Sequence, residues 1–231
     1  MPIKPVKIIE GKLIAAIIMS TCIVLVVYVL LSVTAGFLVL HPRHMMMQWQ
    51  LGSQDLSAES WKSAVSSVEL AAKLDQLNNE YIYDLGRLHE WRALQGPIWS
   101  ETSRMYRSQA ILYYRTALQY QSVWPQAWIQ LAENKVLNQG FDAEVIHALT
   151  LALEYGSWEY GVHKKLIWLG IATWDHLPEK TKDKVRNLIV DSLKNHRNVD
   201  YINNTAKYFN WDEHLNIPVT NEIPSSRENH E

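Results

Sequence analysis

The chain has 231 residues, a formal net charge of −2 and a single cysteine, Cys22. A net charge this close to zero provides no basic surface patch of the kind that nucleic-acid binding needs, so nucleic acid is excluded as a partner. One thiol cannot form an intramolecular disulfide, so packing or a partner must stabilise the fold. The length is enough for one folded domain and an accessory segment.

An uncharged apolar run extends from Leu13 to Leu40. About 20 helical residues, at about 1.5 Å each, cross the hydrocarbon core of a bilayer, so this run is long enough to span it. A cleaved signal peptide is the alternative, but its apolar region is normally about 7–15 residues long. The sequence therefore predicts one uncleaved transmembrane helix over residues 13–40, which contacts membrane lipid.

The charges around this run predict its orientation. Lysines precede it at positions 4, 7 and 12, whereas Arg43 stands almost alone on the other side until Lys62. The positive-inside rule then leaves residues 1–12 in the cytoplasm and places the rest across the membrane. Just past the run, Met45–Met47 either lie at the membrane interface or pack on the first helices, and packing is the commoner fate of methionine.

The remainder of the chain predicts an all-α domain over residues 45–214. Apolar residues recur there at spacings of three and four, and no alternating β pattern occurs. The expected helices include residues 57–74, 80–94, both sides of a turn at Trp124, 141–153, 159–173, 178–193 and a short terminal helix at 199–209. Residues 215–231 are polar with two prolines, which predicts a disordered tail.

The domain contains an internal repeat, because residues 64–86 align with residues 110–132 without a gap. Each block has two small residues flanking a bulky one, then a turn, then a Leu followed by a small residue. Helices about 8–10 Å apart need a small residue where they cross and a bulky one beside it. The blocks start 46 residues apart (110 − 64). Relative to a repeat of roughly 34 residues, about twelve are inserted, around Gly96–Ser103.

This pattern, clearest in Gln109–Ala132, resembles the tetratricopeptide repeat over residues 57–158. The resemblance implies that the transmembrane helix is followed by an array of helical hairpins, whose first helices line a concave groove. The groove residues that it implies, with the inserted Trp99, are Glu80, Tyr83, Arg87, Glu90, Trp99, Gln126, Gln130 and Glu133. Mixed charge with tyrosine suits a peptide or protein partner, and a specific contact is expected first where the insertion meets the groove near Tyr83 and Arg87.

The sequence offers little support for catalysis. The nine histidines show no metal-ligand spacing, and no Gly-rich phosphate loop or nucleophile elbow occurs. No enzyme activity, metal or cofactor is therefore expected. Glu101, Glu133 and Glu144 could supply a glycosidase pair, but carboxylates on a helical array are normally solvated. Of ten tryptophans, only Trp99 and Trp124 fall in predicted turns, where they either contact a ligand or pin loops.

The whole chain also resembles a narrower group. It has a short basic N-terminus, one apolar span, a Trp-rich helical domain and the segment ALEYGSWEYGVHKKLIWLGIATWDHLP at Ala152–Pro178. These features are similar to the VpsP-type polysaccharide biosynthesis proteins of Gram-negative bacteria, small inner-membrane accessory proteins. The resemblance implies a periplasmic domain over residues 45–214 and partners among the inner-membrane proteins of polysaccharide assembly or export. It transfers no catalytic residue.

Three functions stay open on this basis. The first is a non-enzymatic, membrane-anchored scaffold in exopolysaccharide (biofilm matrix) biosynthesis or export. The second is an assembly scaffold for another envelope machine, such as secretion or cytochrome maturation. The third is a glycan-modifying enzyme, which only the tryptophans and glutamates support.

Overall fold

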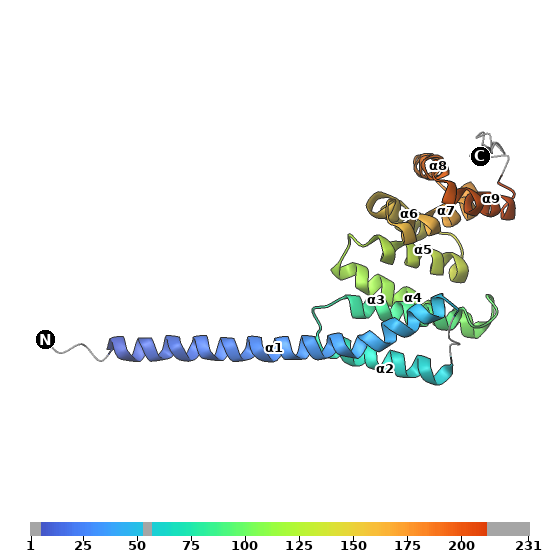
Figure 1. Ribbon diagram of the computed structural model, residues 1–231. Coiled ribbons are helices and arrows are strands. Elements are labelled where there is room, and N and C mark those ends of the chain that lie inside the picture. The colour runs from blue at the N-terminus through green and yellow to red at the C-terminus, as the bar shows by residue number, and fades with distance from the viewer. Residues whose placement is uncertain (1–5, 53–56, 212–231) are drawn as a thin grey trace, which may run out of the picture. The chain divides into compact units, whose positions relative to one another are not determined.

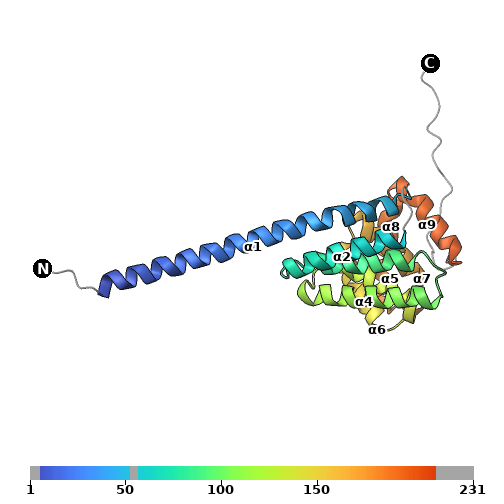
Figure 2. The same ribbon diagram turned by 90° about the horizontal axis from the view of Figure 1, so that it is seen from below.

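The computed structural model describes residues 6–52 and 57–211, which form nine α-helices and one short 3-10 turn, without a strand in these ranges (Figures 1 and 2). The expectation of an all-α fold is therefore confirmed. The elements are α1 (Val6–Gln50), α2 (Ala58–Leu74), α3 (Glu80–Ala93), α4 (Glu101–Tyr120), α5 (Pro125–Gln139), α6 (Ala143–Gly156), α7 (Tyr160–Ala172), η1 (Trp174–His176), α8 (Glu179–Leu193) and α9 (His196–Tyr208). They form two compact units, residues 1–148 and 149–231. The predicted disordered tail, residues 215–231, lies outside the described residues.

The first helix, α1, is long and apolar enough from Lys12 onward to span a membrane. It is 45 residues long, or about 67 Å at about 1.5 Å per residue. Every side chain from Lys12 to Leu31 is exposed in the isolated chain, including the apolar ones. Apart from the hydrogen bond of Tyr28 to Asp75, this apolar stretch is left exposed by the rest of the chain, so it needs a non-aqueous environment or a partner to cover it.

The second half of α1 is part of the packed domain. Ala35 and Val39 are 0% and 2% exposed, and α1 lies beside α2 along this stretch (Figure 2). Met45 and Met46 are also buried, which confirms that the methionine run packs on helices. Packing therefore begins about ten residues before the predicted domain start at residue 45, inside the apolar run itself.

Arg43 fixes this part of α1 to α3. Its Nε donates to Oδ2 of Asp84 at 2.6 Å, and its Nη2 donates to Glu80 at 2.9 Å. The Asp84 side chain is only 3% exposed, and its other oxygen lies 3.5 Å from Arg87. A buried carboxylate needs such partners, so Arg43 stabilises the packing of α3 on α1.

The helices of the first unit begin and end close to the predicted boundaries. The hydroxyl of Ser57 accepts a hydrogen bond from the backbone N–H of Ser60 at 3.0 Å and caps α2. Ser100 caps α4 in the same way, four residues after Gly96, where the predicted insertion begins. The inserted residues thus form the α3–α4 connection, residues 94–100, and the first turn of α4.

The two aligned blocks are buried alike. Their equivalent positions are Ala64 and Ala110, Val68 and Tyr114, Ala71 and Ala117, and Leu85 and Leu131, and all eight side chains are at most 3% exposed. Gly86 shows why the first block needs a small residue. A Cβ atom there would lie 2.7 Å from Cε1 of the fully buried Tyr114 on α4. Only glycine allows α3 and the tyrosine ring to approach this closely.

An aromatic cluster joins α2, α3 and α4. The Trp61 ring lies 5.4 Å from His89 and 5.3 Å from Tyr106, and its Nε1 donates to the carbonyl oxygen of Leu88 at 2.8 Å. His89 also lies 5.3 Å from the Tyr113 ring. Burial among these rings lowers the pKa of His89 to about 4, because the imidazolium form loses its hydration.

The lowered pKa of His89 predicts that the folded domain is less stable in acid. Its pKa is near 6.5 in the unfolded chain and about 4 in the folded one, so its neutral form favours folding above pH 6.5 and this contribution is lost as the pH falls toward 4. Since His89 is partly exposed, we expect the free energy of unfolding to fall by about 1–2 kcal/mol between pH 7.5 and pH 5 on its account. Urea unfolding followed by circular dichroism measures this, and His89→Leu should lose most of it. The exposed His147→Leu is the control; equal pH dependence in both variants would contradict the assignment.

The second unit is a smaller helical cluster. Gly170 on α7 lets the helix approach Val185 on α8, since a Cβ atom at Gly170 would lie 2.7 Å from Cγ1 of Val185. Trp211, which is 2% exposed, meets the Trp174 ring edge-on at 4.9 Å. Pro178, the predicted first helical residue, is the N-cap of α8, so the helix begins one residue later than predicted. The predicted terminal helix at 199–209 is α9.

Candidate functional site

The predicted groove begins on one face of α3. Glu80, Tyr83, Arg87 and Glu90 are spaced by three, four and three residues, so they share that face. Glu80 is exposed, and the other three are half-buried. Each of the four has a partner within the domain, so this face contributes to the fold as well as to the surface.

Tyr83 joins the two helices on which the groove was placed. Its ring lies 4.6 Å from Trp124 and 5.5 Å from Tyr114. Trp124 is the N-cap residue of α5, so this contact brings the N-terminal ends of α3 and α5 together. Of the two roles open to Trp124, the geometry supports the pinning of the turn, because the ring is half-buried against Tyr83.

The charged residues of the α3 face are held in place. The hydroxyl of Tyr114 donates to Oε2 of Glu90 at 2.5 Å, and Arg87 lies 3.5 Å from Asp84. Burial first, and then the nearby Glu90 carboxylate, raise the pKa of Tyr114 well above its usual value. The phenol therefore stays protonated and remains a donor at neutral pH.

The α5 part of the groove is more polar and half-buried. Gln126, Gln130 and Glu133 are all half-buried and have partners within the domain. The side-chain amide of Asn134, which is buried, donates to the backbone carbonyl oxygen of Gln130 at 2.9 Å, one turn earlier in α5. The surface offers amides and carboxylates for hydrogen bonding and no cluster of cations for an acidic ligand.

Trp99 lies away from the rest of the predicted groove. It belongs to the α3–α4 connection and is 65% exposed. Tyr83 lies near the start of α3, ten residues before its last residue, Ala93, which separates the two ends by about 15 Å along the axis. The insertion was expected to meet the groove near Tyr83 and Arg87. The connection leaves α3 at the end opposite Tyr83, so the insertion adjoins the Glu90 end of this face.

One more exposed aromatic was missed by the sequence reading. Trp158 in the second unit is 73% exposed, and lies between α6 and α7. The sequence analysis expected surface tryptophans only in predicted turns and did not place residue 158 in one, so this side chain was expected between helices. Its neighbours Gly156 and Ser157 are turn signals that could have marked it.

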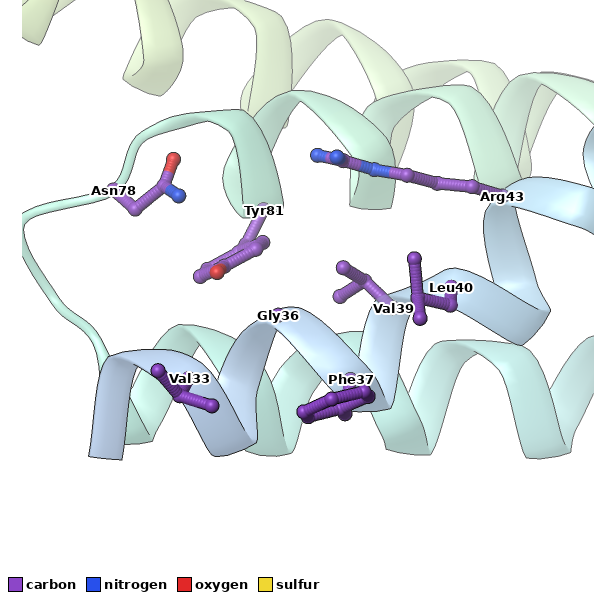
Figure 3. A pocket seen from close by; sticks show the side chains of 8 residues that line it. All are labelled: Val33, Gly36, Phe37, Val39, Leu40, Arg43, Asn78 and Tyr81. Atoms are coloured by element: carbon purple, nitrogen blue, oxygen red, sulfur yellow. The ribbon is translucent and has the colours of Figure 1, made fainter. Parts of the chain in front are cut away.

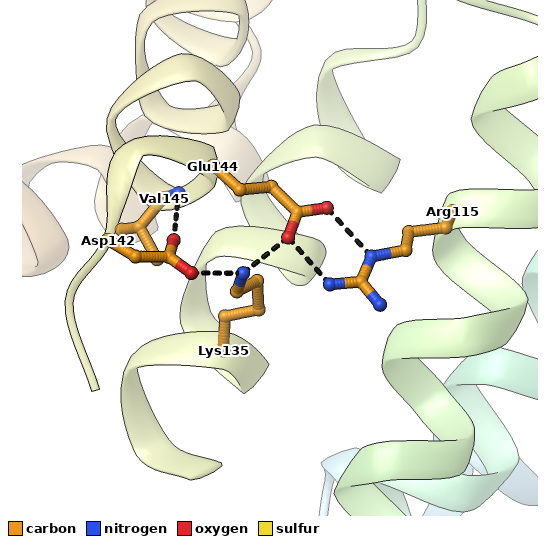
Figure 4. A network of polar contacts seen from close by, with 5 residues as sticks. All are labelled: Arg115, Lys135, Asp142, Glu144 and Val145. Carbon is orange, nitrogen blue, oxygen red and sulfur yellow. Dashed lines mark hydrogen bonds and ion pairs between the residues drawn. The ribbon is translucent and has the colours of Figure 1, made fainter. Parts of the chain in front are cut away.

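An ion cluster around one buried lysine lies on the first unit and was not visible in the sequence (Figure 4). Arg115 on α4 binds both carboxylate oxygens of Glu144, at 2.7 and 2.6 Å. Lys135 on α5, whose side chain is 3% exposed, also contacts Glu144 and lies 2.6 Å from Asp142. Asp142 caps α6, because its Oδ1 accepts from the backbone N–H of Val145 at 3.0 Å.

The cluster borders a pocket of about 250 Å³ whose lining includes Trp128 and Leu131. Hydrogen bonds from Arg115, and then from Lys135, lower the pKa of Glu144 to about 2. A glycosidase acid must carry a proton near neutral pH, so Glu144 is unsuited to that role. Its partner candidate Glu101 is the exposed first residue of α4.

Within residues 6–52 and 57–211, no group of three or more His, Cys, Asp and Glu side chains is arranged to hold a metal ion. Comparison of the chain with protein-family models, with curated protein sequences and with solved structures finds no match.

Proposed function

We propose that this protein is a membrane-anchored, non-enzymatic scaffold that presents a helical-repeat surface to protein partners. The observation that carries the proposal is that one helix, α1, is both the apolar span and a packed member of the helical domain. A domain built onto its anchor without a flexible linker keeps a fixed distance and orientation relative to the bilayer. Such an arrangement suits the assembly of partners that are themselves in the membrane.

The finer parts of the proposal follow from the sequence. The flanking lysines favour a cytoplasmic N-terminus and a domain across the membrane. The resemblance to VpsP-type proteins favours the inner membrane, a periplasmic domain and partners in exopolysaccharide assembly or export. The resemblance to tetratricopeptide repeats is supported by the matched burial in the two blocks, from Ala64 and Ala110 to Leu85 and Leu131. It favours Tyr83, Gln126 and Gln130 as the centre of the partner surface.

Two rival functions lead to different partners or products. A scaffold for secretion or cytochrome maturation would use the same surface with another set of membrane proteins. A glycan-modifying enzyme is less favoured, because Arg115 and Lys135 bind both oxygens of Glu144, which leaves that carboxylate unsuited to act as the general acid and occupied as a nucleophile. A turnover assay with oligosaccharides tests the enzyme function, since only an enzyme would form a product.

We expect a photo-cross-linking amino acid at Gln126 to capture polysaccharide transport or transferase subunits in Gram-negative cells. The same residue at Leu112, an exposed position on α4, is the control and should capture much less. Mass spectrometry of the adducts identifies the partner. Capture of translocation or cytochrome-maturation subunits would support the second function instead. A reporter fused after Glu231 tests the side of the membrane, and cytoplasmic activity of the reporter would overturn the periplasmic proposal.

A further inference from the structure

The packing of α1 shows which end of the first unit faces the bilayer, if α1 spans one as proposed above. Lys12 is the last charge before the apolar run, so the hydrocarbon core begins near Leu13. About 20 helical residues, or about 30 Å, place its far edge near Ser32. Burial gives the same position, because the side chains of residues 12–31 are exposed and Ala35 is the first buried one after them. The surface of the domain nearest Ser32 therefore lies beside the lipid headgroups.

The turn between α2 and α3 lies at this level. The hydroxyl of Tyr28 donates to Oδ1 of Asp75 at 3.1 Å, which places the start of the turn beside the exposed half of α1. Asn78, near the end of the turn, lines a pocket of about 380 Å³ between α1 and α3, and Figure 3 shows it at the Val33 end of that pocket. Val33 is the residue after the expected edge of the hydrocarbon core. Both ends of the turn therefore lie next to the bilayer.

The turn between α4 and α5 lies at the same end of the unit. Consecutive helices from α1 to α5 pack side by side and alternate in direction, so the α2–α3 and α4–α5 turns share one end (Figure 1). The ring contact of Tyr83 with Trp124, at 4.6 Å, places the second turn beside the first part of α3. Tyr83 lies only about 5 Å beyond Glu80, the first residue of α3. The lipid headgroups extend about 5–7 Å beyond the hydrocarbon core, so the second turn borders this layer.

Both turns expose apolar side chains in an uncharged stretch of the chain. Leu77 in the first turn is 78% exposed, and Tyr120 and Val123 around the second are 69% and 59% exposed. Residues 76–79 and 116–132 contain no Asp, Glu, Lys or Arg. Tyrosine and tryptophan are enriched at membrane–water interfaces, where the polar tip meets the headgroups and the ring meets the chains. The two turns therefore have the composition of a surface that contacts lipid.

The opposite end of the unit differs in its charges. The α3–α4 connection also exposes apolar side chains, such as Trp99 at 65%. However, Arg92, Glu101 and Arg104 all lie close to Trp99 in the sequence, and the last two are exposed. The absence of charge is thus confined to the turns on the bilayer side. This difference separates a lipid contact from apolar exposure that occurs on any protein surface.

We propose that the two turns form a second contact with the bilayer, in which Leu77, Tyr120 and Val123 lie among the lipid headgroups where α1 leaves the membrane. This inference rests on the proposed membrane span. The occupant is the lipid surface, because the turns continue the exposed surface of α1 at the depth where the span ends. The nearest exposed charge on α2 is Lys73, a cation that can bind lipid phosphates. Contacts beside the span fix the tilt and rotation of the domain, as a scaffold for membrane partners requires.

The test uses the full chain in phosphatidylcholine vesicles that contain a lipid with a nitroxide on its headgroup. A fluorophore is attached to Leu77→Cys or to Val123→Cys, each combined with Cys22→Ser. We expect the nitroxide to quench these labels at least threefold more than a label at Leu112→Cys in the same background. Leu112 is 54% exposed and lies on α4, about 12 Å further from the bilayer than Tyr120.

Leu77→Asp tests the contact without a label at that position. A carboxylate loses hydration where the turn meets lipid, so this variant should reduce the quenching of a label at Val123→Cys at least twofold. Leu112→Asp is the control and should leave that quenching unchanged. Equal quenching of labels at residues 77, 123 and 112 would overturn the contact. Quenching that disappears when the protein is diluted in lipid would assign the turns to a second copy instead.

A label attached to the native Cys22 separates this contact from the span. Cys22 is exposed and lies near the middle of the proposed span. A nitroxide on the lipid acyl chain should quench this label in the otherwise unaltered chain. Absence of that quenching would refute the span and the contact together. A quenched Cys22 label, without the expected difference between residues 77 and 112, would refute the contact alone.

Discussion

A chain that begins at residue 45 is expected to unfold without a cooperative transition, or to be less stable than one that begins at Ser32 by about 6 kcal/mol. The shorter chain lacks Ala35 and Val39, which are buried, and their loss accounts for about 3 kcal/mol at about 25 cal/mol per Å². It also lacks Arg43, so the buried Asp84 carboxylate loses its closest cation, at about 3 kcal/mol. A domain of this size has a total stability of only about 5–15 kcal/mol.

Urea unfolding of both chains in the same mild detergent, followed by circular dichroism, measures the difference. Arg43→Met in the longer chain separates the two causes, since it removes the ion pair and retains the packing of Ala35 and Val39. Equal unfolding midpoints for the chains that begin at residues 32 and 45 would show that α1 does not stabilise the domain. The proposed scaffold would then be tethered by a helix that is not part of its fold.

Glu144→Gln is expected to destabilise the first unit by about 2–3 kcal/mol, because it removes the charge that two cations share. Lys135 is 3% exposed and would keep only Asp142, and Arg115 would keep no carboxylate within this cluster. Lys135→Met should cost much less. It takes away the buried charge itself and leaves Glu144 bound to Arg115, and such replacements are often neutral.

The same cluster predicts a second acid transition. The pKa of Glu144 is lowered to about 2, so its contribution is complete above about pH 4.5 and is lost as the pH falls from there toward 2. Urea unfolding at pH 7 and pH 3 measures it, and Glu144→Gln should reduce that difference. Asp183→Asn is the matched control, since the Arg186–Asp183 pair is exposed and should contribute at most about 0.5 kcal/mol. A larger loss from Lys135→Met than from Glu144→Gln would contradict the cluster.

The helices could be predicted because their signals are local. Apolar residues at spacings of three and four, a Ser57 cap and the Gly96-Pro97 pair lie within a few residues of the boundaries that they determine. The contacts of the candidate groove could not be predicted in this way, because the side chains that meet there are far apart in sequence. Tyr83 stacks on Trp124, 41 residues later (124 − 83), and no local pattern indicates that contact. Glu144 was expected to be a solvated carboxylate for the same reason, because its partners Arg115 and Lys135 lie on other helices.

By itself, the sequence determined that residues 13–40 are apolar and helical and that an all-α domain follows. Only the tertiary structure decided where the exposed span ends and the domain begins. Val33 and Val39 are equally apolar in sequence, yet Val33 is 50% exposed whereas Val39 is 2% exposed against the domain. The physical reason is that lipid and a protein core favour the same side chains. Composition therefore predicts that α1 avoids water, and only the packing of α2 and α3 shows which part of it is covered by protein.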